Sequence, residues 1–283
     1  MRFNRLLLIA LALAASGCGS VMRSAQNSLA TQLTTAALEH DDVATVASAL
    51  PAYLLLLDAG VQSSPNDGAS LCSAAKLYGA YSGGMVSDPQ RQRRLALRAF
   101  GYGQRGACAL HGPLCDASGQ SFDDLGALAG TLQTKQLPAL ACLAGAWANV
   151  VQANSDSPEA QADIPKVRVL YERIAELDPA YGRGEAQMAL GVLNSLLPAA
   201  FGGKPELGKA YFEKAIELGG GHNLMAKVLY AQYYGRLTFN QELHDRLLKE
   251  VSEAPAQAPG MTLMNQVAKQ RALELAASGK DYF

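Results

Sequence analysis

Residues 204–237 read KPELGKAYFEKAIELGGGHNLMAKVLYAQYYGRL, and this stretch decides the fold. Apolar side chains recur every three or four residues over Pro205–Leu218, which is the spacing of one helical face. The three glycines at 219–221 then predict the end of that helix, because glycine adopts left-handed dihedral angles without a Cβ clash. Helical spacing resumes over Asn223–Leu237. Two helices joined by a short glycine turn are typical of helical-repeat proteins, which bind other molecules.

Part of this unit occurs earlier in the chain. Tyr171–Leu177 aligns with Phe212–Leu218 at an offset of 41 residues, and a weaker copy begins at Tyr53. These units resemble tetratricopeptide repeats, whose usual period is about 34 residues. The excess length lies in residues 196–205. The resemblance predicts an all-α, tetratricopeptide-like array of about a dozen antiparallel helices.

The composition agrees with a folded helical protein. Of the 283 residues, 49% are hydrophobic and 17% are charged, which argues against a disordered chain. Alanine and leucine dominate, and both favour helix over strand. The formal net charge is −1 and no basic cluster occurs, so the sequence does not predict a nucleic-acid partner.

Periodicity and turn residues predict helices along nearly the whole chain. Pro51, Pro89, Pro165 and Pro205 are interpreted as start signals or first-turn prolines, and Gly83-Gly84 as a stop. The predicted helices cover 29–39, 41–62, 67–82, 88–110, 121–133, 137–153, 164–177, 181–198, 205–218, 223–237, 239–252 and 262–278.

The N-terminus resembles a bacterial lipoprotein signal. Arg2 and Arg5 precede the apolar run Leu6–Ala15, which is too short to span a bilayer as a helix. Small residues then lead to Cys18 in a pattern similar to a lipobox, in which the cysteine becomes lipidated. An uncleaved signal anchor is the alternative.

This resemblance predicts three segments: a signal peptide over 1–17, a lipid-anchored tether over 18–28 and a tetratricopeptide-like helical domain over 29–283. Acyl chains on Cys18 would attach the protein to a membrane. Gly19 occupies the position where aspartate usually retains lipoproteins at the inner membrane. We therefore expect an outer-membrane anchor with the domain facing the periplasm.

Four further cysteines are interpreted by their surroundings. Cys108 and Cys115 bracket a Gly-Pro turn and could form a local disulfide in an oxidising compartment. Cys72 and Cys142 lie in alanine-rich helical segments, where cysteine usually acts as a small buried apolar residue. A metal site of Cys108, Cys115 and His111 is a weaker alternative because it lacks a fourth ligand, so no metal is predicted.

The sequence carries no recognisable motif of catalysis or cofactor binding. The sequence contains no nucleophile elbow, phosphate-binding lysine loop, His-Glu-x-x-His or dinucleotide-binding motif. We therefore predict neither an enzyme nor a bound cofactor.

A polar and aromatic stripe instead recurs on the first helix of each predicted pair. In tetratricopeptide arrays these helices line the concave surface that holds ligands. The alternative is that the tyrosines are core residues and that Asn223 is a helix N-cap. The predicted ligand-binding or partner-binding residues are Tyr78, Tyr81, Glu185, Asn223, Lys227, Tyr230 and Tyr234, with Met85, Tyr181 and Met188 on the same stripes.

Ordered motifs over most of 45–283 resemble the T component associated with TRAP transporters. The resemblance rests on Leu197–Glu206, Phe212–Ile216, Gly220–Val228, Glu242–Leu248 and the ending from Asn265 to Tyr282-Phe283, with Leu54–Asp58, Tyr78, Tyr81 and Ala146-Trp147 upstream. The cysteine-bearing segment around 108–120 departs from the family pattern.

The resemblance implies a periplasmic lipoprotein that works beside an extracytoplasmic solute-binding protein. A small organic ligand could occupy a helical cleft, and we hypothesise that Lys227 lines it with Tyr230 and Tyr234. Assembly into a homo-oligomer is left open. Two other functions compete: a tetratricopeptide scaffold of the cell envelope without a ligand, and an enzyme assembled from Lys227, Glu185 and His244.

Overall fold

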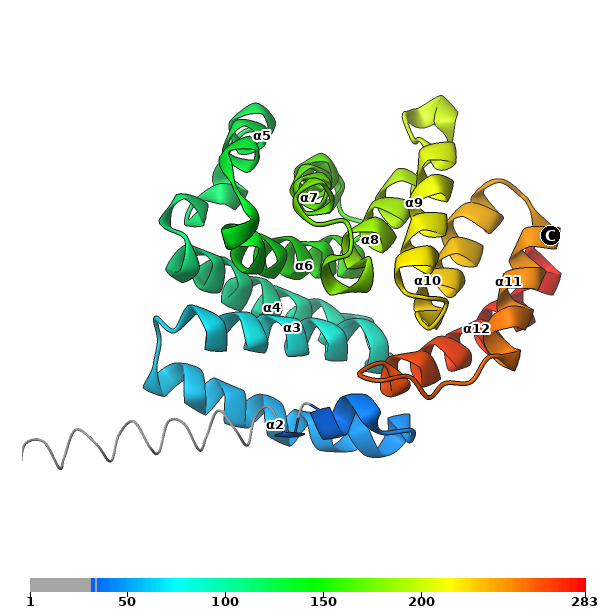
Figure 1. Cartoon of the computed structure of the whole chain (residues 1–283), viewed down its shortest axis with the longest axis horizontal. Coiled ribbons are helices and arrows are strands. Elements are labelled where there is room, and N and C mark those ends of the chain that lie inside the picture. The colour runs from blue at the N-terminus through cyan, green and yellow to red at the C-terminus, as the bar shows by residue number, and fades with distance from the viewer. Residues whose placement is uncertain (1–31, 34) are drawn as a thin grey trace, which may run out of the picture.

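The computed structural model describes residues 32, 33 and 35–283, and this part of the chain contains helices and turns but no strand (Figure 1). The all-α prediction is therefore confirmed. The predicted signal peptide, Cys18 and the tether to residue 28 lie outside the described residues.

The first half of the chain builds a stack of long helices. Each of the first three begins at an aspartate, Asp42, Asp67 or Asp88, whose carboxylate accepts a hydrogen bond from a backbone N–H of the first turn. The helices of this half are α2 (Val43–Ser63), α3 (Gly68–Met85), α4 (Pro89–Leu110), α5 (Phe122–Thr131) and α6 (Leu137–Ala153), with short 3₁₀ turns η1 (Gly112–Leu114), η2 (Ala117–Gly119) and η3 (Thr134–Gln136).

The second half alternates helices with short turns. Its elements are α7 (Pro158–Leu177), η4 (Tyr181–Arg183), α8 (Glu185–Asn194), η5 (Ala199–Phe201), α9 (Pro205–Leu218), α10 (Leu224–Leu229), the π-helix η6 (Tyr230–Gly235), α11 (Gln241–Glu253) and α12 (Thr262–Tyr282). Helix α8 packs closely on α9 because Gly191 has no Cβ, which would lie 2.7 Å from the Phe212 ring.

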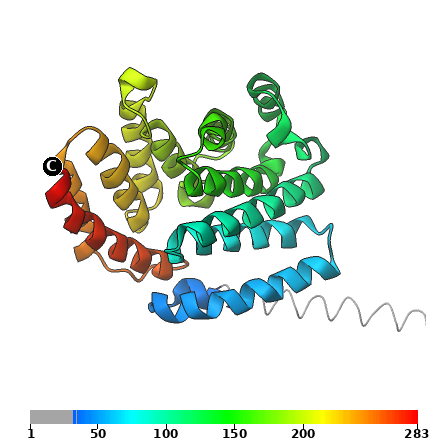
Figure 2. The same cartoon turned by 180° about the vertical axis from the view of Figure 1, so that it is seen from behind.

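The helices follow one another in a curved array, and both views show α2 at its outer edge (Figures 1 and 2). The start of α12 returns to the N-terminal helices, where Leu263 belongs to the same buried cluster as Leu50 and Leu71. Glu39 also accepts a hydrogen bond from Thr262. The two ends of the described chain are therefore joined.

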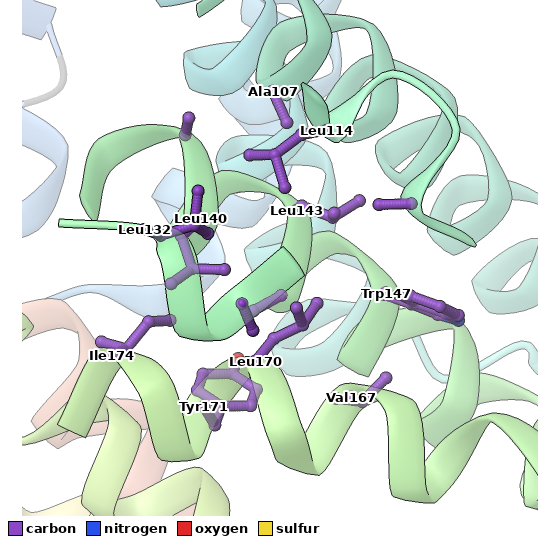
Figure 3. Packing of buried hydrophobic residues seen from close by; sticks show 14 of the residues in the cluster. Ala107, Leu114, Leu132, Leu140, Leu143, Trp147, Val167, Leu170, Tyr171 and Ile174 are labelled. Atoms are coloured by element: carbon purple, nitrogen blue, oxygen red, sulfur yellow. The ribbon is translucent and has the colours of Figure 1, made fainter. Parts of the chain in front are cut away.

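The central core explains how α4, α6 and α7 are held together. Leu140, Leu143, Leu170 and Ile174 interdigitate between α6 and α7 (Figure 3). Trp147 is a packing anchor, as predicted: it is 1% exposed, and its Nε1 donates a hydrogen bond to Asp163 (2.9 Å). These contacts fix the two helices that carry most of the site described below.

The aligned segments of the predicted repeat form equivalent helix ends. Tyr171 and Phe212 are both buried, as are Ile174 and Ala215, and one segment closes α7 as the other closes α9. This equivalence is local. A tetratricopeptide arrangement over the whole chain stays a prediction.

Several boundary predictions were wrong. Pro51 and Pro165 lie inside α2 and α7 rather than in a first turn, and α7 begins at Pro158. Gly83-Gly84 lies in the last turn of α3 rather than ending it. A proline lacks only one helical N–H, and the buried contacts of each helix, such as Leu54 in α2 and Val167 in α7, outweigh that loss.

Two disulfides occur among the described residues. Cys108 pairs with Cys115, and Cys72 pairs with Cys142 to link α3 to α6. The interpretation of Cys72 and Cys142 as unpaired buried residues was wrong, because they are 70 residues apart and only the packing of α3 against α6 brings them together.

Candidate functional site

A cavity of about 1090 Å³ lies between α3, α6, α7 and α8. Its size fits a drug-sized or larger ligand. Helices α3 and α6 pack against each other and both contribute small residues to the lining, Ala69 and Ala80 on α3 with Ala141, Gly145 and Ala148 on α6.

The segment that follows α8 forms one rim of the cavity. Leu196, Leu197, Gly202 and Gly203 all line it. The segment turns back sharply: Gly202 has φ +84°, and a Cβ on Gly203 would collide with the Leu197 carbonyl oxygen. Lys204 N–H then donates to Asn194 O (2.9 Å), which closes the turn. The excess length that the sequence places at 196–205 is thus cavity wall.

Two tyrosines and one carboxylate form a polar group within this apolar wall. Tyr171, Tyr181 and Glu185 all line the cavity, and none makes a side-chain hydrogen bond to another described residue. Burial raises the pKa of both phenols, and the negative charge of Glu185 raises each pKa further. The two hydroxyls therefore stay protonated and can donate to a ligand.

Two cations complete the polar lining. Lys76 on α3 is exposed to the cavity and forms no ion pair with a described residue. Arg168 on α7 lies one turn before Tyr171, and its Nε is 3.9 Å from Glu172, which is a weak contact. Both cations are available to a ligand with a negative group.

Of the seven predicted binding residues, only Glu185 lines this cavity, together with its stripe neighbours Tyr181 and Met188. Tyr78 and Tyr81 lie on the other side of α3. Tyr78 donates to Asp58 (2.8 Å), and the Tyr81 hydroxyl accepts from Arg91 (3.1 Å). Both phenols are buried, so the alternative of core packing describes them.

The hypothesis that Lys227 lines the cleft with Tyr230 and Tyr234 is wrong for this cavity. Lys227 pairs with Glu250 (2.7 Å). Tyr230 stacks on Phe212, with the ring centroids 5.3 Å apart. Tyr230 and Tyr234 belong to the core that α10 and η6 form with α9 and α11, and Lys227 lies at the edge of that core.

Their polar groups have partners in that core. Tyr230 donates to Glu213 (3.2 Å), and Tyr234 donates to Glu206 (2.9 Å). Asn223 occupies the N-cap position of α10 as predicted, but its side chain makes no capping hydrogen bond. None of the four predicted residues of this segment lines the cavity.

Sequence reasoning missed Tyr233, which does line the cavity with Leu229. Tyr233 lies in the π-helix η6, between the two core tyrosines. The signal that could have identified it is its position: Tyr233 is a polar aromatic residue adjacent to the helical face that carries Tyr230 and Tyr234. π-Helical turns re-aim side chains in this way and occur often at functional sites.

The structure does not bring together the three residues of the enzyme hypothesis. His244 is fully buried and contacts Asp245 (Nδ1 to Oδ1, 2.9 Å). Lys227 pairs with Glu250, whereas Glu185 lines the cavity. Within the described residues, no group of three or more His, Cys, Asp or Glu side chains could hold a metal ion.

The fold and this cavity define the class as a helical-array protein with a large cavity that is open to solvent on one side. The family model for the TRAP transporter T-component matches residues 39–283. The chain belongs to that family, whose members are accessory components of transporters. No curated protein matches the chain.

Proposed function

We propose that this protein is a non-catalytic, lipid-anchored accessory component of a TRAP-type transport system. It holds a small organic ligand in the cavity and docks the solute-binding protein at the cavity rim. Cys18 carries the acyl chains, and the domain faces the periplasm from the outer membrane. The observation that carries this proposal is the cavity of about 1090 Å³ with unpartnered phenol hydroxyls in its wall.

The lining indicates the chemistry of the ligand. Met188, Val192 and Leu193 provide an apolar wall, whereas Lys76 and Arg168 provide positive charge. The two phenol hydroxyls have no hydrogen-bond partner among the described residues, so they are free to donate to a ligand that accepts hydrogen bonds. An amphipathic organic acid, with an apolar body and a negative group, satisfies these features.

A scaffold without a ligand is less well supported. A scaffold needs an exposed surface and gains nothing from a cavity of about 1090 Å³ lined by small residues such as Ala141, Gly145 and Ala148. The cavity therefore favours the ligand-binding function.

The ligand is tested with the full chain purified from membranes. Native mass spectrometry should find a small molecule bound to the wild type. Ala148→Trp places an indole in the cavity and should lower occupancy at least about tenfold, and Glu185→Gln should change affinity. Lys227→Ala, which lies outside the cavity, is the matched control and should bind as wild type. Equal occupancy in Ala148→Trp and wild type, with native circular dichroism, would refute the ligand-binding function.

The rim supports a docking site for the solute-binding protein. Phe201 is 76% exposed and Leu197 is 50% exposed, and both lie in the segment that closes the cavity. Exposed aromatic residues are common anchors of protein interfaces. The partner is the solute-binding protein of the same TRAP system.

Docking is tested by co-purification. Phe201→Ser should weaken capture of the solute-binding protein at least about tenfold. Phe239→Ser is the control, since Phe239 is 72% exposed but lies between η6 and α11, outside the cavity lining. Equal capture by both variants would place the docking site elsewhere. Fatty-acid labelling that persists in Cys18→Ser would contradict the lipid anchor.

A further inference from the structure

The exposed face of α2 carries no charged side chain. The only charged residue of the helix is Asp58, which is 6% exposed. By contrast, Leu55 is 68% exposed and Leu56 is 63% exposed. The residues of this face share one side of the helix by their spacing of three and four, and they are Thr45, Ser48, Ala49, Ala52, Leu55, Leu56 and Ala59.

This composition is unusual for a surface helix. Helix α2 is long and apolar enough to span a membrane, yet most of its residues are not buried in the protein. The core helix of a soluble protein is just as apolar but is mostly buried. The face of α2 therefore requires a cover that the described chain does not provide.

The inner face of α2 excludes a transmembrane orientation. Asp58 accepts hydrogen bonds from Tyr78 (2.8 Å), Tyr102 (2.6 Å) and Arg98 (2.7 Å). Leaving these partners for hydrocarbon would strand a carboxylate, which is prohibitively unfavourable. Leu50 and Leu54 are also packed into the N-terminal core. Helix α2 is thus fixed flat along the body of the protein.

The position of α2 in the chain indicates what covers it. It begins 25 positions after Cys18 along the sequence. An extended segment of that length spans at most about 90 Å, so a bilayer holding Cys18 lies within reach of α2. Both views place α2 at the outer edge of the molecule (Figures 1 and 2).

The surroundings of α2 fit a lipid headgroup layer. Arg98 reaches Asp58 from α4 and is 51% exposed, and its neighbour Leu97 is 54% exposed. Arg105 donates to the Pro65 carbonyl beyond the end of α2. Exposed Asp41 and Asp42 precede the helix. An apolar face bordered by charges of both signs suits the interface of a bilayer.

We propose that α2 lies in the interface of the membrane that carries the lipid anchor, with Leu55 and Leu56 at the acyl boundary. This inference rests on the lipid anchor of the proposed function. It orients the molecule, because α3 separates α2 from the cavity: Tyr78 contacts Asp58, whereas Lys76 lines the cavity. The cavity and its rim then face the periplasmic solution.

Depth-dependent quenching tests this orientation. The full chain, purified from membranes, is reconstituted in phosphatidylcholine vesicles whose acyl chains carry bromine. Leu56→Trp should lose at least about half of its added emission, because the indole lies at the acyl boundary. Leu273→Trp is the control, since Leu273 is 65% exposed on α12 and should not be quenched. Native Trp147 is 1% exposed and contributes a background measured in the wild type.

Three outcomes would overturn the proposal. The first is quenching of Leu56→Trp no greater than that of Leu273→Trp. The second is a concentration-dependent blue shift of Leu56→Trp without lipid, which would show that a second copy covers α2. The third is quenching that persists in Leu55→Glu/Leu56→Trp. Mass spectrometry of the same samples measures acylation of Cys18 and ligand occupancy of the cavity. If both are intact while Leu56→Trp is not quenched, the membrane orientation of α2 is wrong and the proposed function stands.

Discussion

Two buried tyrosines differ in what their hydroxyls contact. Tyr171 is 5% exposed, and its hydroxyl has no hydrogen-bond partner among the described residues. Tyr78 is 4% exposed and donates to the buried carboxylate of Asp58. Tyr171→Phe should change the free energy of unfolding by less than about 0.5 kcal/mol, because no bond is lost. Tyr78→Phe should cost about 1–3 kcal/mol, because Asp58 loses a donor. Urea unfolding measures both.

The same pair separates a structural role from a binding role. Tyr171→Phe should lower the affinity for the cavity ligand and leave stability unchanged. Tyr78→Phe should lower stability and leave ligand affinity unchanged. A large loss of stability in Tyr171→Phe would show that its hydroxyl has a structural partner.

The tyrosines also predict how stability responds to alkaline pH. Burial, with a hydrogen bond to Glu206 and that residue's charge, raises the pKa of Tyr234 to about 12. An unfolded tyrosine titrates near 10. Because the folded pKa is the higher one, this stabilisation is complete below about pH 10 and is lost as the pH rises through about 12. Tyr78, Tyr171 and Tyr230 have pKa values raised by burial in the same direction.

Thermal unfolding between pH 8 and 12 measures this dependence, with phenolate absorbance recorded in parallel. We expect the melting temperature to decrease as the pH rises above 10. The decrease should be smaller in Tyr234→Phe. A flat profile to pH 12 would contradict the prediction.

Individual site residues were only partly predictable. Helical spacing identified the stripe of Tyr181, Glu185 and Met188, all of which line the cavity. The same spacing selected Tyr230 and Tyr234, which are core residues. Periodicity reports that residues share a face, but whether that face meets solvent, a cavity or the core depends on helices far away in the sequence.

The disulfides act at the scale of elements. The Cys72–Cys142 bond closes a separation of 70 residues and joins two walls of the cavity, whereas the Cys108–Cys115 bond closes only 7. In the loop-entropy model the longer loop contributes about 4 kcal/mol and the shorter about 2 kcal/mol. The double variant Cys72→Ala/Cys142→Ala should therefore lose more stability than Cys108→Ala/Cys115→Ala. Guanidinium unfolding of the two variants measures the difference.

The cavity provides a second measurement for the same variants. Without the Cys72–Cys142 bond α3 and α6 can separate, so ligand affinity should fall. Removal of the Cys108–Cys115 bond, which lies at the end of α4, should leave affinity unchanged. If the two double cysteine variants lost equal stability and equal ligand affinity, the two disulfides would not differ in role as proposed.

At this scale most helices could be predicted and most irregularities could not. Caps and glycines carry local information, so α4, α6 and α9 match their predicted ranges within a residue. The π-helix η6 has no local signal, because its extra residue is accommodated by packing between α8, α9 and α11. The Cys72–Cys142 bond was missed for a similar reason: pairing depends on tertiary structure.

The whole molecule is closed rather than open-ended. An open helical array contacts only neighbouring repeats, and its cooperativity breaks down with length. Here α12 returns to the N-terminal helices through Leu263 and Thr262, more than 200 residues from Leu50 and Glu39. No repeat period predicts such a contact, which is why the sequence indicated an array but not its closure.

Closure predicts that the protein unfolds in one transition. Leu263 is 4% exposed in the N-terminal core, so Leu263→Ala should cost about 2–5 kcal/mol. Because the two ends are joined, that loss should appear equally in far-ultraviolet circular dichroism, which reports all helices, and in the fluorescence of Trp147, which lies in the central core. Leu273→Ala is the control, since Leu273 is exposed on the same helix and should shift neither midpoint. If Leu263→Ala lowers the circular dichroism midpoint while the Trp147 midpoint stays in place, the N-terminal helices unfold independently of the centre and α12 does not couple the two ends.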